Sequence, residues 1–278
     1  MEKKIIMVAP NGAKKTKEIL PQIPLSPAEL AEEAKNCADN GASIFHLHIR
    51  DKNQGHTLDV GIYRETIAEI KRIAGDSIIV QATTENCGIY QPHEQMQMVR
   101  ELKPEAISCA VREFVPTPEH ETAAKEFFAW VEQENIWPQY ILYSPDEIRK
   151  FADLKARGII PAKHNFVLLV LGRKSVEQPK DAFAKPHDLD PYLATVREVC
   201  PDVTWAICAF GGNENECMKY AFEQGGHARI GFENNHWLVD ESIAPSNAAL
   251  VKQLVETSGI EPATANEVRN KYSGTRQP

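Results

Sequence analysis

The clearest pattern in the chain is an alternation of apolar and polar side chains between residues 45 and 49. Phe45, Leu47 and Ile49 are apolar, and His46 and His48 stand between them. Successive side chains of a β-strand point to opposite faces, so this pattern predicts a strand whose three apolar side chains lie under helices. The two imidazoles then lie side by side on the other face of the strand.

Strand patterns and helix patterns alternate along the rest of the chain. We predict strands over residues 5–9, 43–49, 78–83, 106–111, 137–143, 166–171, 203–209 and 228–231. We predict the helices that follow them over residues 26–41, 62–73, 91–102, 121–134, 144–158, 189–199, 216–224 and 246–256. Ser26 and Glu29 have the spacing of a capping box at the first helix, with Pro27 in its first turn. One more helix is expected after Thr264, which stands three residues before Glu267.

Eight successive strand–helix units predict an α/β protein whose strands close into a (β/α)8 TIM barrel, followed by one extra C-terminal helix. The length of 278 residues is close to the roughly 250 residues that are typical of such a barrel. We therefore expect a single domain over residues 1–278. The alternative is an open, doubly wound sheet, but no G-x-G-x-x-G sequence follows the first predicted strand.

Composition and charge narrow the class of protein. Hydrophobic residues make up 42% of the chain, enough for a full core, and the formal net charge is −8. There is no basic cluster to attract nucleic acid, no signal-peptide pattern and no apolar stretch long enough to cross a bilayer. The six cysteines show no Cys-x-x-Cys spacing, which is typical of reduced thiols. We expect a cytoplasmic enzyme without a nucleic-acid or membrane partner.

In a (β/α)8 barrel, the active site lies at the carboxyl ends of the strands. The residues that follow the predicted strands and are expected on this rim are Asn11, Lys14, Thr83, Thr84, Glu85, Arg112, Glu113, Arg173, Gly211, Gly212, Arg229 and Glu233. Any one of them could be an ordinary loop residue. Their convergence on the rim that also carries His46 and His48 indicates a functional site.

Neutral imidazole is the commonest metal ligand among side chains, and two histidines on one face of a strand form a bidentate site. The plain alternative is a pair of buried histidines that hydrogen-bond to other core groups. A catalytic metal usually takes a third protein ligand. Glu233 can supply it, because the eighth strand lies two places from the second around a closed barrel. The competing carboxylates are Glu85, Glu113 and Asp51. Two histidines and one carboxylate suit zinc or non-haem iron, so these residues alone leave the metal open.

Longer motifs resemble a known family. His46-Leu47-His48-Ile49-Arg50-Asp51 follows Asn11-Gly12-Ala13 and precedes Arg229-Ile230-Gly231-Phe232-Glu233-Asn234-Asn235. Together with Pro24-Leu25-Ser26-Pro27 and Ala244-Pro245-Ser246-Asn247-Ala248, these motifs resemble the β-keto acid cleavage enzymes. That family is typified by 3-keto-5-aminohexanoate cleavage enzyme and was formerly catalogued as a domain of unknown function. The resemblance covers nearly the whole chain.

The resemblance implies a zinc-dependent TIM barrel that condenses a β-keto acid with acetyl-CoA to give acetoacetate and a new acyl-CoA. It implies one zinc ion per chain, held by His46, His48 and Glu233 and acting as a Lewis acid on the β-keto group. Arg229 matches the family arginine that assists proton transfer and holds negative charge. Thr83 matches a hydroxyl position that hydrogen-bonds the substrate.

Some positions depart from the family pattern. Asn234 stands where an aspartate usually assists the arginine as base, and a neutral amide cannot take up a proton at working pH. Glu85 stands where the family usually has glycine, and it could serve as the replacement base or be solvated. Lys14 stands at a position that is often glutamate, and Arg112 and Glu113 form a charged insertion.

These departures lead to a prediction about the substrate, which we expect to be bound by Asn11, Lys14, Arg112 and Glu113. The positive charges of Lys14 and Arg112 would repel an ammonium group. Two unit charges about 4 Å apart interact by roughly 4 kcal/mol at an effective dielectric constant near 20. The sequence therefore predicts a β-keto acid with a neutral or anionic tail, unless Glu113 or Glu85 pairs with one of the cations.

Two other classes of protein stay open on the residues alone. A metal-dependent amidohydrolase also uses a His-x-His strand, with His164 and His187 as candidates for its further ligands. A non-catalytic metal- or ligand-binding barrel would keep the histidine pair without needing Arg229. The resemblance also favours a homo-oligomer, with a tetramer preferred, in which Trp237 could anchor contacts between chains or cover its own active site.

Overall fold

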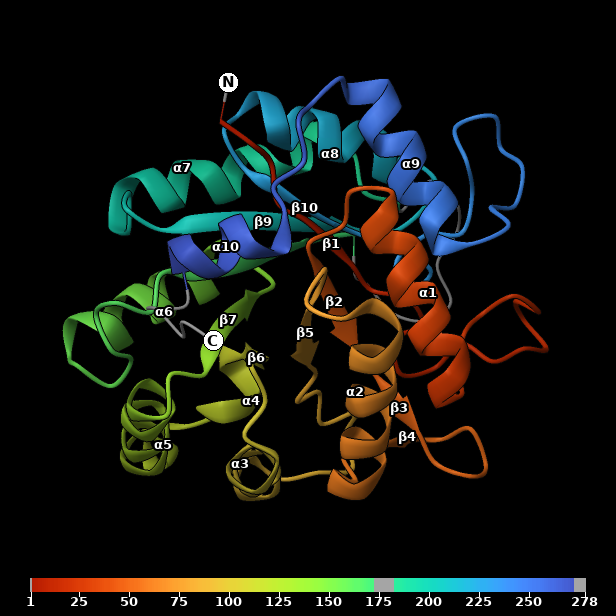
Figure 1. Ribbon diagram of the computed structural model, residues 1–278. Coiled ribbons are helices and arrows are strands. Elements are labelled where there is room, and N and C mark those ends of the chain that lie inside the picture. The colour runs from red at the N-terminus through yellow and green to blue at the C-terminus, as the bar shows by residue number, and fades with distance from the viewer. Residues whose placement is uncertain (1, 173–182, 273–278) are drawn as a thin grey trace.

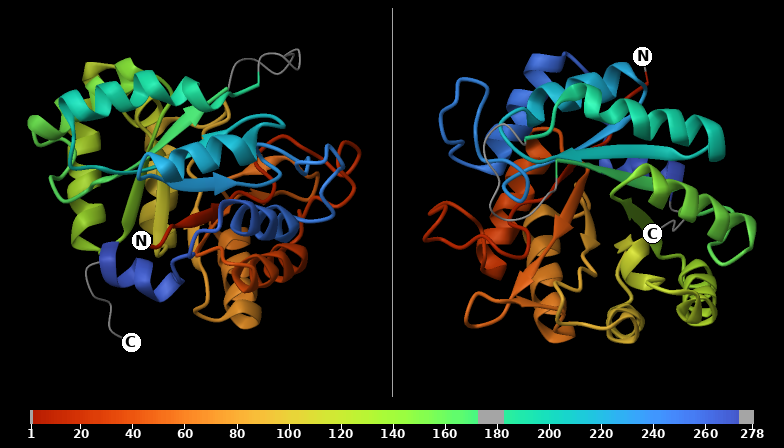
Figure 2. Two further views of the ribbon diagram at one scale, coloured as in Figure 1. Left: turned by 90° about the horizontal axis from the view of Figure 1, so that it is seen from above. Right: turned by 180° about the vertical axis from the view of Figure 1, so that it is seen from behind.

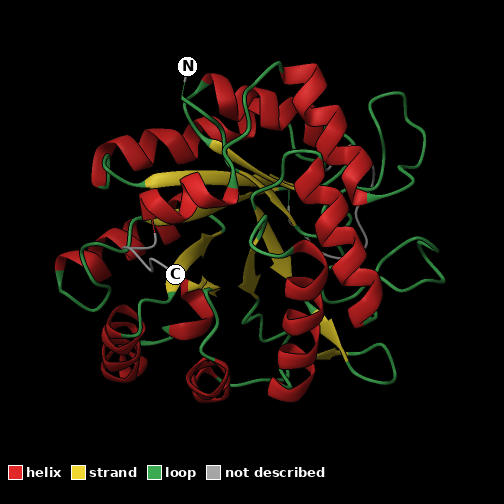
Figure 3. Ribbon diagram, in the orientation of Figure 1, coloured by secondary structure: helices red, strands yellow, loops and turns green. Residues whose placement is uncertain are grey.

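The computed structural model describes residues 2–172 and 183–272 (Figure 1). Parallel strands close into a barrel in the order β1-β10-β9-β8-β7-β6-β5-β2. The barrel strands are β1 (Ile6–Val8), β2 (Ile44–Leu47), β5 (Ile79–Ala82), β6 (Ala106–Ala110), β7 (Trp137–Leu142), β8 (Phe166–Leu171), β9 (Thr204–Ala209) and β10 (His227–Ile230). Helices surround the strands in Figure 3, so the predicted (β/α)8 barrel is confirmed.

The helices are α1 (Pro27–Asp39), α2 (Val60–Ala74), α3 (Pro92–Leu102), α4 (Val111–Phe114), α5 (Glu121–Gln133), α6 (Pro145–Ala156), α7 (Asp190–Val199), α8 (Glu214–Glu223), α9 (Asn247–Ser258) and α10 (Ala265–Tyr272). The predicted capping box is present on α1: Ser26 Oγ accepts from Glu29 N at 3.3 Å, and Glu29 Oε2 accepts from Ser26 N at 3.0 Å. None of the helices within residues 2–172 and 183–272 has the length and apolarity that crossing a bilayer requires.

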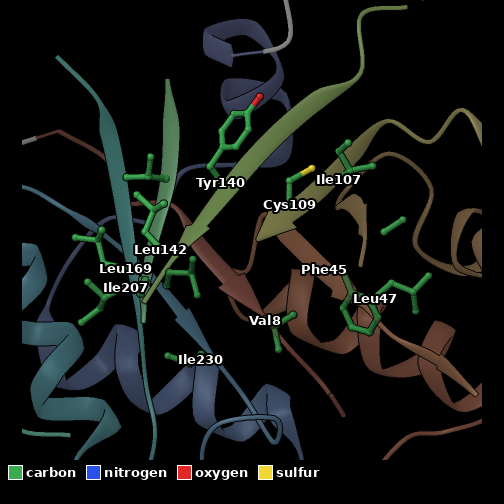
Figure 4. Close-up of a cluster of buried hydrophobic side chains, with 14 of the residues drawn as sticks. Val8, Phe45, Leu47, Ile107, Cys109, Tyr140, Leu142, Leu169, Ile207 and Ile230 are labelled. Atoms are coloured by element: carbon green, nitrogen blue, oxygen red, sulfur yellow. The ribbon is translucent and has the colours of Figure 1, made fainter. Parts of the chain in front are cut away.

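The outward faces of the strands pack under the helices. Phe45 and Leu47 on β2 point outward and join a buried cluster with Val8, Tyr140 and Ile230, which Figure 4 shows between strands and helices. Apolar residues in this layer lose their contact with water, which is the main favourable contribution to folding. The apolar half of the alternation at residues 45–49 is therefore in the position that the sequence predicts.

The inside of the barrel is apolar near the amino ends of the strands. Near the amino ends of the strands it is filled by an apolar cluster that includes Met7, Ile44 and Phe166. Helix α10 lies across this end in Figure 1, and its Ala265 and Val268 belong to the same cluster. The predicted extra helix therefore closes the amino end of the barrel, and the open end is the one at which the strands finish.

The loops after β1 and β10 extend from that open end, as the left view of Figure 2 shows. They touch each other, because Gln22 Nε2 in the first loop donates a hydrogen bond to Ala244 O in the second at 2.8 Å. Two segments from opposite ends of the chain therefore build one side of the rim together.

Two predicted strands extend wrongly into residues that belong to another element. Strand β2 stops at Leu47, and the chain continues into a two-stranded ribbon of β3 (Ile49–Arg50) and β4 (His56–Thr57). Asp51 closes this ribbon, since its Oδ1 accepts from Asn53 N and Gly55 N, both at 2.8 Å. Asp51 therefore shapes a turn and does not join the histidines.

The second wrong end is that of the fourth predicted strand, which was expected to include Val111. Strand β6 stops at Ala110, and Val111 begins the short helix α4. The change of direction buries Phe114, whose ring lies 5.5 Å from that of Phe127 and 5.8 Å from that of Phe128. Packing against α5 therefore outweighs the strand pattern at this point.

His227 generates a prediction about acid stability. Its Nδ1 accepts a hydrogen bond from Ile5 N at 3.2 Å, so that nitrogen carries no proton, and burial lowers the pKa of His227 to about 4. An unfolded histidine has a pKa of about 6.5, so the unfolded chain takes up a proton first as the pH falls. The contribution of His227 to the free energy of unfolding is complete above about pH 6.5 and is lost as the pH falls toward about 4. We expect this loss to lower the free energy of unfolding by roughly 3 kcal/mol over that interval.

Urea unfolding near pH 7 and near pH 4.5 measures this loss. His227→Gln should lose less stability between the two conditions, because glutamine keeps an acceptor for Ile5 N and does not titrate. His93→Gln changes an exposed histidine on α3 and should behave like the unmodified protein. Equal losses in the two variants would contradict the role of His227.

Candidate metal centre and active site

Strand β2 brings two imidazoles together inside the barrel. His46 is the third residue of β2, and His48 comes directly after its end. His46 Nε2 lies 3.1 Å from His48 Nε2, and the two rings meet edge to face with centroids 4.9 Å apart. Both residues are at most 1% exposed. The polar half of the alternation thus places two ring nitrogens at one point, as predicted.

Glu233 reaches the same point from the turn after β10. Its Oε2 lies 3.7 Å from His46 Nε2 and 3.4 Å from His48 Nε2. Gly12 leaves room for this side chain, because a Cβ there would lie 2.7 Å from Glu233 Cγ. Glu233 Oε2 is buried and has no hydrogen-bond partner among the described residues. A buried carboxylate oxygen without a partner is costly, and a bound cation would satisfy it.

The geometry fits a divalent metal. Ligand atoms of His46, His48 and Glu233 all lie within 4.8 Å of one another. Within the described ranges, no other group of three His, Cys, Asp or Glu side chains converges in this way. Glu85 and Glu113, which the sequence left as competitors, are outside the group. Two imidazoles and one carboxylate form a donor set that is common in catalytic metal sites.

A chain of amides orients His46. Its Nδ1 lies 2.8 Å from Gln81 Oε1, and because that oxygen can only accept, Nδ1 carries the proton and Nε2 keeps its lone pair. Gln81 Nε2 donates to Gln139 Oε1 at 3.3 Å, which sets the orientation of the Gln81 amide. Burial, assisted by the charge of Arg229, lowers the pKa of His46 to about 3. The ring is therefore neutral near pH 7, as a metal ligand must be.

A buried ion pair lies beside the histidines. Arg229 Nη2 donates to Glu233 Oε1 at 3.0 Å and to Asn234 Oδ1 at 3.3 Å. Asn234 Nδ2 donates back to Arg229 O at 3.3 Å. Burial acts to raise the pKa of Glu233, but Arg229 and the two histidines outweigh it and hold that pKa well below its usual range. The ionised carboxylate therefore directs one oxygen to Arg229 and the other to the histidines.

A pocket opens beside this cluster at the carboxyl ends of the strands. Its lining consists of His46, Thr83, Thr84, Glu85, Ser108, Ala110, Glu113, Ile141, Tyr143, Val170, Arg229 and Glu233. Glu85 Oε2 lies 3.9 Å from His48 Nδ1, and Thr83 Oγ1 accepts from Glu85 N at 3.2 Å. Ser108 Oγ is buried there without a partner among the described residues. The predicted residues Arg229, Thr83 and Glu85 thus share one pocket.

The predicted substrate residues do not all reach this pocket. Glu113 lines it, and its Oε2 accepts from Asn86 N at 3.0 Å and from Gln95 Nε2 at 2.9 Å. Burial raises the pKa of Glu113. Asn11 is fully buried, and its Nδ2 donates to His48 O at 3.1 Å. Asn11 therefore ties the first loop to the end of β2.

Lys14 and Arg112 are not among the residues that line the pocket. Lys14 is exposed. The Arg112 guanidinium stacks 3.3 Å above the centre of the Tyr143 ring and lies 3.7 Å from Glu147 Oε1. The described lining of the pocket therefore contains neither of the two cations from which we predicted a neutral or anionic substrate tail, and it contains carboxylates. Contact of Lys14 or Arg112 with the substrate tail stays a prediction.

Other predicted rim residues and rival ligands are placed as follows. Gly211 N donates to Asn234 O at 3.2 Å and so supports the turn after β10. Arg173 lies outside the described residues. His164 Nδ1 lies 3.1 Å from the Tyr140 hydroxyl, and the exposed His187 pairs with a neighbouring aspartate. Since neither joins the histidine pair, the arrangement expected of an amidohydrolase is not formed by these residues.

Three polar residues near the site were not expected from the sequence: the buried Gln81 and Glu214 and the half-buried Lys15. Gln81 faces inward on a strand that was predicted, so the alternation that singled out His46 could have found it. Lys15 and Glu214 contact the turn after β10 from distant parts of the chain. No local pattern signals such contacts, because they depend on how loops fold back over the barrel.

Comparisons with known proteins match nearly the whole chain to one family. A sequence profile described as beta-keto acid cleavage enzyme matches residues 3–273. The 3-keto-5-aminohexanoate cleavage enzyme of Acetoanaerobium sticklandii is 30% identical, over 97% of this chain and 97% of its own length. The 3-oxoadipate:acetyl-CoA acetyltransferase of Cupriavidus necator is 27% identical, over 95% of this chain and 93% of its own.

The fold also has a close structural counterpart. The structure titled as the ternary complex of ObcA with C4-CoA adduct and oxalate superposes with a TM-score of 0.70 at 16% identity. The match covers 91% of this chain and 67% of that chain. At this identity the likeness concerns the barrel fold alone.

The site geometry predicts one divalent metal ion per chain. His46→Ala and Glu233→Gln should each weaken metal binding, by about 10-fold or more, because each removes one of three protein ligands. Elemental analysis after dialysis measures the metal content, and circular dichroism checks that the variants stay folded. His187→Ala changes an exposed histidine and serves as the control. Full occupancy in His46→Ala would reject the assignment.

Proposed function

This chain belongs to the beta-keto acid cleavage enzyme family, and we propose that it condenses a β-keto acid with acetyl-CoA. The carbon next to the substrate carboxylate forms a bond to the acetyl carbonyl, and its bond to the original keto carbon breaks. The CoA thiolate takes up the released acyl group, so the products are acetoacetate and a new acyl-CoA and no further reactant is needed. The observation that carries the proposal is the buried cluster of His46, His48, Glu233 and Arg229 beside a pocket at the barrel mouth.

We propose zinc as the metal of this centre, with His46, His48 and Glu233 as its ligands. Zinc commonly takes nitrogen and oxygen ligands and, with three from the protein, keeps one coordination position for substrate. When bound, it supplies Lewis-acid polarisation of the keto oxygen, which makes the neighbouring carbon more acidic. The protein's own contribution is to keep the His46 imidazole neutral and the Glu233 carboxylate ionised.

Arg229 is the group we propose to stabilise negative charge on the substrate. It lines the pocket, and a guanidinium in a water-poor site stabilises developing charge strongly. Asn234 Oδ1 accepts from that guanidinium, and Asn234 Nδ2 donates to the backbone oxygen of Arg229, so we assign Asn234 an orienting role. Thr83 Oγ1 accepts from Glu85 N, which leaves its hydroxyl proton to donate to the substrate.

Glu85 is the group we propose as the base that removes the substrate proton. It lines the pocket, and its Oε2 lies 3.9 Å from His48 Nδ1, close to the proposed metal. Its backbone is tied on two sides, because Glu85 O lies 2.7 Å from His56 Nε2 and Glu85 N donates to Thr83. A carboxylate can accept the proton that Asn234 cannot.

The charges of the pocket support a substrate tail that carries hydrogen-bond donors or a positive charge. Among the described residues of the lining, Glu85 and Glu113 carry carboxylates, and Arg229 pairs with Glu233. An unpaired anionic tail placed beside these carboxylates would be repelled. We therefore assign Glu113 to the tail, while contacts of Asn11, Lys14 and Arg112 with substrate stay predictions.

The test is acetoacetate formation by the zinc-loaded protein from acetyl-CoA and a panel of aminated, neutral and dicarboxylic β-keto acids. Arg229→Gln should lower kcat/KM by about 100-fold or more, because it removes a preorganised charge. Lys125→Gln, an exposed position on α5 outside the pocket lining, is the control. No acetyl-CoA-dependent product from any member of the panel would contradict the proposed reaction.

Glu113→Gln tests the tail in the same assay. It should lower kcat/KM for aminated substrates and raise or preserve it for dicarboxylic ones, because it removes a negative charge from the wall. The reverse ranking would show that the tail does not approach Glu113.

We also propose that residues 1–278 form one domain, that the protein is cytoplasmic, and that it assembles into a homo-oligomer, with a tetramer favoured by the family resemblance. Pairing of β1 with β10, in which Met7 lies opposite Arg229, joins the two ends of the chain in one barrel. Trp237 is half-buried, with its ring 5.9 Å from that of Phe183, so it is a weaker anchor than the sequence suggested. Val239 and Ile243 in the same loop are exposed.

Light scattering tests the assembly. A tetramer should have about four times the chain mass of 31.1 kDa. Replacing both Val239 and Ile243 by lysine should shift the protein toward smaller species, because charge at an apolar contact opposes association. A stable monomer at micromolar concentration would reject the oligomer.

A further inference from the structure

The metal ligand Glu233 is carried by a tight turn after β10. Asn234 N and Asn235 N both donate to Gly231 O, at 2.8 and 2.9 Å, and Glu233 N donates to Ala9 O at 3.0 Å. Gly231 has a φ of 130°, and a Cβ there would lie 2.5 Å from Ala9 O. On this side, the turn is pressed against the end of β1.

A buried carboxylate holds the turn from the opposite side. Glu214, the first residue of α8, is 2% exposed. Its Oε1 accepts from Gly231 N at 3.3 Å, and its Oε2 accepts from Asn235 Nδ2 at 3.4 Å. One side chain thus ties the first and the last residue of the turn whose middle residue is Glu233. Glu214 does not line the pocket and has no place in the proposed reaction.

The half-buried side chain of Lys15 supports the same turn. Lys15 Nζ donates to Phe232 O, and the charge of Lys15 also attracts Glu214. Burial raises the pKa of Glu214 to about 8 and lowers that of Lys15. Neutral Asn247 makes a comparable tie, since its Oδ1 accepts from Phe232 N at 2.7 Å. A neutral side chain can therefore make such a hydrogen bond to the turn. Burying an ionisable group there instead opposes folding.

We propose that Glu214, supported by Lys15, is a positioning residue for the metal ligand Glu233. By fixing Gly231 and Asn235, it sets where the Glu233 carboxylate can point, with Oε1 on Arg229 and Oε2 toward His46 and His48. A rotation of the turn would separate these oxygens from both sets of partners. The inference rests on the metal centre proposed above.

The test measures zinc affinity of the full chain by competition with a chromophoric chelator. Groups that hold metal ligands in place typically change affinity by 10–100-fold, so Glu214→Ala should weaken zinc binding by about that factor. Glu214→Gln should weaken it less, because its carbonyl still accepts from Gly231 N while its NH2 group faces the Asn235 amide. Glu216→Gln, on the exposed side of the same helix, is the matched control and should leave the affinity unchanged.

Thermal unfolding of the metal-free and zinc-loaded protein separates positioning from a merely structural role. A structural role lowers the metal-free Tm and leaves zinc affinity unchanged, whereas positioning also reduces the rise in Tm that zinc produces. Lys15→Met is a second variant for the same measurement if Glu214→Ala does not fold. It should weaken zinc binding as well. Unchanged zinc affinity in both Glu214→Gln and Lys15→Met would overturn the inference. Absence of zinc binding by the unmodified protein would instead overturn the metal centre.

Discussion

The structure depends on one buried ion pair, between Arg229 and Glu233, inside the closed barrel. Charges taken out of water destabilise a fold unless their partners are complete. Here Arg229 is held by Glu233 Oε1 and Asn234 Oδ1, while Glu233 Oε2 is left with two imidazole nitrogens and no hydrogen-bond donor among the described residues. A divalent cation would supply the partner that Glu233 Oε2 lacks among the described residues. The electrostatics of the ion pair therefore support the metal site proposed above.

Strand register explains why these groups meet. His46 on β2 lies opposite Gln81 on β5, so parallel pairing alone places the orienting amide beside the imidazole. Arg229 on β10 lies opposite both Met7 on β1 and Cys208 on β9, and its Nη2 lies 3.4 Å from Cys208 Sγ. Paired residues in a parallel sheet share a face, so one ring of inward side chains forms the floor of the pocket. Below it, the apolar cluster closed by α10 keeps water from that floor.

The features of the fold and site that could be predicted from the sequence are those set by residues close together in the chain. The alternation at residues 45–49 predicts the histidine pair, and capping boxes predict helix starts, because both reflect contacts between near neighbours. Loop conformation escaped prediction: of the adjacent Lys14 and Lys15, the first is exposed and the second reaches Phe232 O. The end of β2 was missed for the same reason, since Asp51 closes the following turn with its own side chain. Periodicity carries no information about such loops.

Asparagine at position 234 changes the electrostatics of the site in two ways. Asn234 contacts the Arg229 guanidinium with a neutral amide, so it neutralises less of the Arg229 charge than an aspartate at this position would. The proton acceptor that an aspartate would supply is lost at the same time. The remaining pocket carboxylates are Glu85 and Glu113, and Glu113 Oε2 already accepts from Asn86 N and Gln95 Nε2. Glu85 Oε2 lies 3.9 Å from His48 Nδ1, so Glu85 fits the proposed role of base better than Glu113 does.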